Sequence, residues 1–162
     1  MKLKHVAIFL MVLVVAAMVG VGWLYMTAQV SVVATGVTAF EAASQAALFG
    51  ELQQQAANDA IVGTVYSTEP IGDIGGYQFY TYTIRLRNDC FIDAESVEVQ
   101  VTTMAGDVVQ LGDFSPKTLP ARTTGDIQAT ILTDAAMHGV REVNITYYLW
   151  GFPFTLRTTC GK

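Results

Sequence analysis

The stretch YQFYTYTIRLR (residues 77–87) carries the strongest strand pattern in this sequence of 162 residues. Its side chains alternate between two faces, and one face becomes apolar toward its end, at Ile84 and Leu86. Aromatic and β-branched residues in such an alternation are typical of a strand that buries one face. The stretch therefore predicts a β-sheet that covers a core.

Shorter alternating segments separated by turn residues surround this stretch. They occupy residues 61–66, 94–103, 108–111, 124–133, 141–150 and 154–159. Seven strands in about 100 residues, with short connections and no intervening helix, predict an all-β fold. We expect an antiparallel immunoglobulin-like or fibronectin-like β-sandwich over residues 61–162, and we expect residues 61–160 to fold on their own.

Three parts of this region together resemble a known strand pattern. They are YTIRLRN (residues 82–88), the Val-x-Val-x-Val segment within 94–103, and TLPARTTG (residues 118–125). The pattern resembles small extracytoplasmic Ig-like accessory domains, including bacterial domains of the late embryogenesis abundant or CARDB type. The resemblance implies binding, spacing or assembly, and it transfers no site residue.

An apolar arm precedes the predicted sandwich. Residues 6–26 are uncharged and long enough to cross a bilayer as an α-helix, which predicts a transmembrane signal anchor. Residues 1–5 form a basic flank that contains Lys2, Lys4 and His5. This flank predicts a single-pass cell-membrane protein with a cytoplasmic N-terminus and an extracytoplasmic C-terminal domain. The alternative is a signal peptide cleaved after residues 32–34.

Residues 27–60 connect the anchor to the predicted sandwich. Within them, residues 38–60 are rich in Ala, Gln, Glu and Leu, which favour a helix. Apolar or small side chains recur there every four residues, so we expect a helical stalk. Such a stalk either packs on its own domain or associates with a second copy.

The two cysteines, Cys90 and Cys160, form a possible disulfide, because an outward-facing domain lies in an oxidising compartment. Simple alternation of strand direction places them at opposite poles, so a bond requires a crossover, and the pairing stays open. His138 has no second ligand at metal spacing, and no nucleophile motif occurs. We expect no enzyme, no metal site and no cofactor.

Tyr148, Trp150 and Phe152 form a possible interaction patch at the end of the 141–150 strand. The alternative is that the predicted helix over residues 38–60 covers Trp150. A net charge of −5 and scattered Lys and Arg residues disfavour nucleic acid as a partner.

The predicted function is that of a non-catalytic surface protein. The protein contacts the lipid bilayer through residues 6–26. Its sandwich binds or scaffolds an unknown protein partner outside the membrane. Self-association is possible. The alternative function is a pilin-like filament subunit in which the apolar N-terminal helix forms the polymer core.

Overall fold

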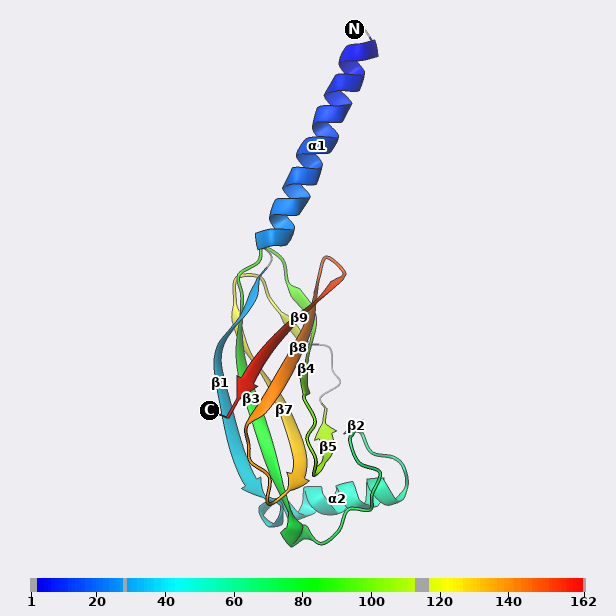
Figure 1. Cartoon of the computed structure of the whole chain (residues 1–162), viewed down its shortest axis with the longest axis vertical. Coiled ribbons are helices and arrows are strands. Elements are labelled where there is room, and N and C mark those ends of the chain that lie inside the picture. Colours follow the sequence, from blue (N-terminus) through cyan, green and yellow to red (C-terminus); the bar gives the residue numbers. More distant parts are fainter. Residues whose placement is uncertain (1–2, 28, 113–116, 162) are drawn as a thin grey trace.

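The chain consists of an apolar helix that stands outside a β-sandwich (Figure 1). The computed structural model describes residues 3–27, 29–112 and 117–161. Helix α1 spans Leu3–Thr27, and its side chains from Ala7 to Met26 are exposed. It contains the segment Lys4–Met26, which is long and apolar enough to cross a membrane. Lys2, part of the predicted basic flank, lies outside the described residues.

Two antiparallel sheets form the sandwich, which confirms that part of the predicted fold. The strands are β1 (Val30–Glu41), β2 (Gly63–Val65), β3 (Tyr77–Asn88), β4 (Ala94–Val101), β5 (Asp107–Leu111), β6 (Lys117–Leu119), β7 (Thr124–Asp134), β8 (Arg141–Leu149) and β9 (Phe152–Cys160). The five-stranded sheet has the order β1-β3-β7-β5-β2, and the four-stranded sheet has the order β6-β4-β8-β9.

The predicted number of seven strands was too low, because β1 and β6 were not expected. Strand β1 also corrects the assignment of residues 27–60 to a linker and helical stalk. It pairs with β3 over its full length, from Val30 opposite Asn88 to Glu41 opposite Gln78. The register shifts between Val32 and Ala34, and most of this edge strand is exposed. Its burial therefore lacks the alternation that identifies a strand from sequence.

Helix α2 (Ala46–Ala57) confirms a helix within residues 38–60, although a shorter one than predicted. A 3-10 turn over Ala42–Gln45 leads into it. It lies across the end of the sandwich opposite α1 (Figure 1). There Phe49 and Leu52 are buried in a small core cluster with Phe79 of β3. Helix α2 is therefore a cap on the far pole and does not form a stalk next to α1.

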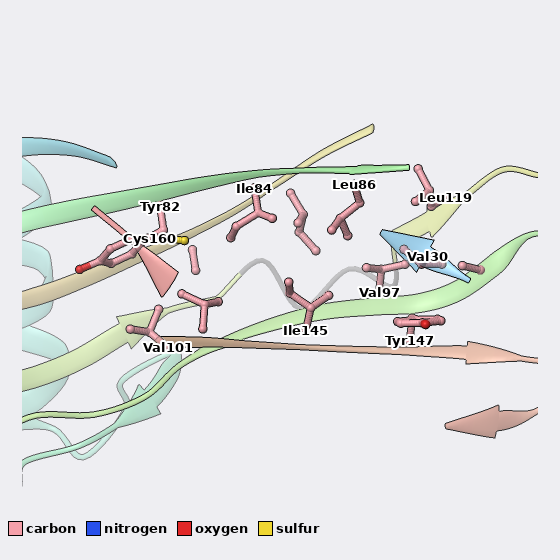
Figure 2. Packing of buried hydrophobic residues seen from close by; sticks show 14 of the residues in the cluster. Val30, Tyr82, Ile84, Leu86, Val97, Val101, Leu119, Ile145, Tyr147 and Cys160 are labelled. Atoms are coloured by element: carbon pink, nitrogen blue, oxygen red, sulfur yellow. The ribbon is translucent and has the colours of Figure 1, made fainter. Parts of the chain in front are cut away.

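The main core lies between the two sheets (Figure 2). From one side it receives Tyr82, Ile84 and Leu86 of β3, which confirms the inner face predicted for that strand. From the other side it receives four buried residues of β8, namely Val143, Ile145, Tyr147 and Leu149. Tyr148, on the opposite face of β8, is exposed, as its alternation predicted.

Candidate functional site

The junction between α1 and the sandwich is held by specific contacts. The Gln29 carbonyl accepts a hydrogen bond from the Asp89 amide at 3.0 Å. The Tyr25 ring, in the last turn of α1, lies 5.4 Å from the Phe154 ring of β9, measured between centroids. Phe154 in turn stacks on the buried Tyr147 at 5.6 Å. A continuous aromatic contact therefore links the end of the apolar helix to the core.

The predicted interaction patch lies at this same pole. Tyr148, Trp150 and Phe152 have 39%, 43% and 61% of their surface exposed, and all three lie around the β8–β9 turn. Figure 1 shows this hairpin rising beside the end of α1. The expectation that the helix of residues 38–60 covers Trp150 is wrong, because α2 occupies the opposite pole. The patch stays exposed.

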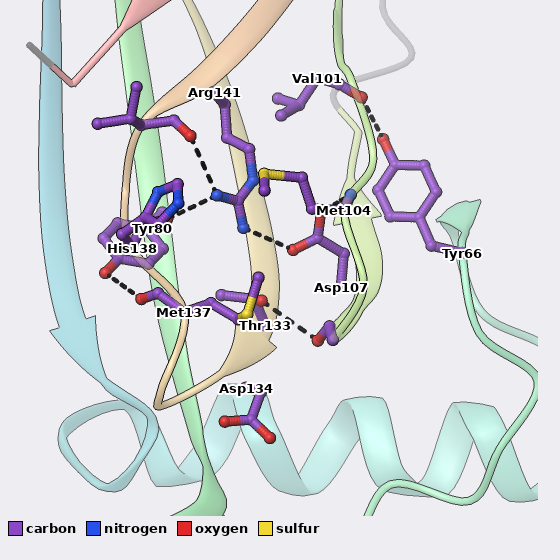
Figure 3. A network of polar contacts seen from close by, with 12 residues as sticks. Tyr66, Tyr80, Val101, Met104, Asp107, Thr133, Asp134, Met137, His138 and Arg141 are labelled. Carbon is purple, nitrogen blue, oxygen red and sulfur yellow. Dashed lines mark hydrogen bonds and ion pairs between the residues drawn. The ribbon is translucent and has the colours of Figure 1, made fainter.

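A buried ion pair joins the two sheets (Figure 3). Arg141 of β8 donates from Nη2 to Asp107 Oδ1 of β5 at 3.0 Å, and both side chains are fully buried. The other Asp107 oxygen accepts the Met104 amide at 2.7 Å. Arg141 Nη1 also donates to the carbonyls of His138 and Val140, at 2.6 and 3.1 Å. With these partners the pair acts as a fixed cross-sheet tie, inaccessible to a ligand.

A second polar contact across the sheets lies beside this pair. Gln110 of β5 donates to the Val99 carbonyl at 2.7 Å and accepts the Val101 amide at 2.8 Å. The Tyr66 hydroxyl lies 2.8 Å from Gln110 Oε1 and 3.0 Å from the Val101 carbonyl. Burial, and secondarily the negative charge of Asp107, raise the pKa of Tyr66 to about 12. The hydroxyl therefore stays protonated and can donate throughout the neutral range.

Sequence reasoning did not identify this polar network. Asp107 follows a glycine in a predicted turn, where aspartate commonly bonds local backbone. The sequence did contain a sign of this network at Arg141. Arg141 alternates in step with the buried Val143 and Ile145, so it lies on the core-facing side of β8. A charged residue at a core-facing position requires an opposite charge in the facing sheet.

The possible disulfide between Cys90 and Cys160 is absent from the structure, where both residues are buried free thiols. Cys90 follows β3 and its Sγ lies 3.6 Å from the Gln29 carbonyl, at the α1 pole. Cys160 lies near Tyr82 and is fully buried in the main core (Figure 2). Along β3, residues 82 and 88 are about 20 Å apart, far beyond the reach of a disulfide.

Both thiols are expected to resist alkylation in the folded protein. Burial raises the pKa of Cys90 and of Cys160, so the reactive thiolate is disfavoured in the native state. Iodoacetamide at pH 8 should modify neither residue until urea unfolds the sandwich, after which mass spectrometry should find both modified without prior reduction. If the two cysteines of the unfolded full-length chain react only after a reductant is added, the unpaired arrangement is contradicted.

Within residues 3–27, 29–112 and 117–161, no group of three or more His, Cys, Asp or Glu side chains could hold a metal ion. His138 contributes its backbone carbonyl to Arg141, as described above. The predicted site residues thus divide into an exposed aromatic patch and two separate buried thiols.

Comparison with known proteins gives no family. No family model matches the chain, and no curated protein matches it. Among solved structures, the cupredoxin domain of amoB from Nitrosocaldus yellowstonii is similar, with a TM-score of 0.37 and 13% sequence identity. The similarity covers 83% of this chain and 88% of that chain. It assigns neither a family nor a ligand here.

Proposed function

We propose that this chain is a single-pass membrane protein whose sandwich acts outside the membrane as an Ig-like, non-catalytic binding or scaffolding module. The observation that carries this proposal is the junction of α1 with the sandwich. Helix α1 has an uncovered apolar surface, and only Ala28 and Gln29 separate it from β1. An apolar helix that is this long and leaves most of its surface uncovered finds its favourable solvent in a bilayer.

The position of β1 supports an anchor that is not removed. Cleavage after residues 32–34 would cut inside β1 and remove Val30, which is only 3% exposed and belongs to the main core. It would also remove the pairs that Val30, Ser31 and Val32 make with the end of β3. An intact strand therefore favours retention of α1. The basic flank supports a cytoplasmic N-terminus.

Two features support a binding or scaffolding role without catalysis. The ion pair and the thiols are sealed in the core, where they cannot meet a substrate. The exposed aromatic residues lie instead at the pole next to α1. The chemistry that this sandwich presents to its surroundings is therefore that of a contact surface.

Membrane extraction tests the anchor. The full chain should stay in the membrane pellet at alkaline pH, keep its intact mass, and dissolve as a monodisperse species in detergent. A variant with Leu13→Lys and Val14→Lys should fail to insert, because each charge at the centre of a span costs about 2.5–3.5 kcal/mol. A shortened, extractable chain would contradict the anchor, whereas fibres that persist without detergent would support the pilin-like alternative.

A further inference from the structure

We propose that the tip of the β8–β9 hairpin, together with Phe91, enters the interfacial layer of the same bilayer that α1 crosses. This second contact would fix the orientation of the sandwich on the membrane. The inference rests on the proposed insertion of α1. The partner of the hairpin tip and Phe91 is the lipid interface itself.

The hairpin is placed at the right depth by its contact with α1. Tyr25 lies in the last turn of the candidate span, where a tyrosine occupies the interface between hydrocarbon and water. The Phe154 ring lies 5.4 Å from the Tyr25 ring, measured between centroids. From Phe154, strand β9 runs back to its first residue, Phe152, which is about 7 Å nearer the turn. The tip of the hairpin points toward the pole at which α1 ends (Figure 1), so Phe152 and the turn residue Trp150 extend from Phe154 toward that pole.

The turn itself is built around an exposed tryptophan at some conformational cost. Trp150 and Gly151 both have positive φ, 52° and 77°, in a two-residue turn between Leu149 and Phe152. Such turns favour Asn, Asp or Gly, since a bulky side chain strains the left-handed backbone. An outlier of this kind points to a role for the side chain. An indole with 43% exposure is suited to a membrane interface, where its ring meets lipid and its N–H meets water.

A second loop presents a matching group at the same pole. Phe91 is 69% exposed and lies in the β3–β4 connection, beside the Asp89 amide that bonds Gln29. The Arg122 guanidinium lies 4.2 Å from the centroid of the Phe91 ring. A cation stacked on an exposed aromatic ring suits the boundary where lipid phosphates meet acyl chains. Aromatic residues from two loops, adjacent to the membrane helix, make lipid the occupant that the geometry favours.

Single-tryptophan variants of the full chain test this contact in vesicles of phosphatidylcholine and phosphatidylglycerol, with or without brominated acyl chains. Trp23→Phe leaves Trp150 as the reporter, and Trp150→Phe leaves Trp23 as the reporter of α1. The control combines Trp23→Phe, Trp150→Phe and Val62→Trp. It places the only tryptophan at a 60% exposed position following α2, at the far pole.

Brominated lipid is expected to quench Trp150 to an extent comparable with Trp23, and to leave the tryptophan at position 62 unchanged. Acrylamide, a quencher in the aqueous phase, should quench the tryptophan at position 62 more strongly than Trp150 or Trp23. If Trp23 is quenched and Trp150 is not, the hairpin contact is overturned while the anchor stands. If neither is quenched, both proposals are overturned. Protection of Trp150 from acrylamide without quenching by lipid would identify a protein occupant and overturn the lipid contact.

Discussion

Replacement of Arg141 by alanine is expected to lower the free energy of unfolding by about 3–5 kcal/mol. The substitution leaves the Asp107 carboxylate in a fully buried position between the sheets, without its 3.0 Å partner. It also leaves the His138 and Val140 carbonyls without the Nη1 donor. Since domains are stable by only about 5–15 kcal/mol, this loss should bring the sandwich close to unfolding.

Urea unfolding of the reconstituted full chain, followed by alkylation of the buried cysteines, measures this loss. The midpoint for Arg141→Ala should fall by at least about 1 M, given typical urea slopes of about 1–3 kcal/mol per molar. Arg85→Ala provides the control, because Arg85 forms a two-point pair with Asp126 at 2.7 and 2.8 Å on the exposed surface. An exposed pair should be worth no more than about 1 kcal/mol. Equal midpoints for Arg141→Ala and Arg85→Ala would show that the buried pair is not a structural tie.

The second large effect concerns where the folded domain begins. A fragment of residues 29–162 is expected to fold as a monomer. Residues 61–162 should not fold, which reverses the expectation from sequence that residues 61–160 fold on their own. The shorter fragment lacks Val30 of the main core and also Phe49 and Leu52 of the capping cluster. Loss of each large buried side chain typically costs about 2–5 kcal/mol, and together these losses approach the whole stability of a domain.

The shorter fragment also uncovers the edge of β3. This strand pairs with β1 from Gln78 to Asn88, so its removal exposes a long row of unpaired backbone groups. Such an edge promotes aggregation. Size-exclusion chromatography and circular dichroism distinguish the outcomes. A monodisperse 61–162 fragment with a cooperative β transition would show that β1 and α2 are accessory to the fold.

Sequence reasoning succeeded where burial alternates. In β3 and β8 one face is inside and the other outside, so period-two patterns identified their inner residues correctly. It failed at β1, whose edge position leaves Val33 and Phe40 exposed, and whose register shift breaks the period. The uncharged arm also runs directly into this strand, so composition marks no boundary between helix and sandwich.

The aromatic patch was predicted more fully than its surroundings. Parity alone placed Tyr148 on the outer face of β8. The location of that face relative to α1 depends on which sheet carries β8 and on the direction of the hairpin, and both depend on the pairing of β8 with β4. The Arg141–Asp107 pair was missed for a related reason, since the two residues are 34 positions apart in the chain and come from different strands.

Cysteine labelling across the membrane tests the central claim, that α1 holds the sandwich on the outer side. The natural cysteines are buried, so an added cysteine reports its own position. In cells with an intact cell membrane, a membrane-impermeant maleimide should label Val62→Cys at the far pole. It should label Lys4→Cys, at the other end of α1, only after the membrane is opened. Labelling of Lys4→Cys with protection of Val62→Cys in intact cells would contradict the account.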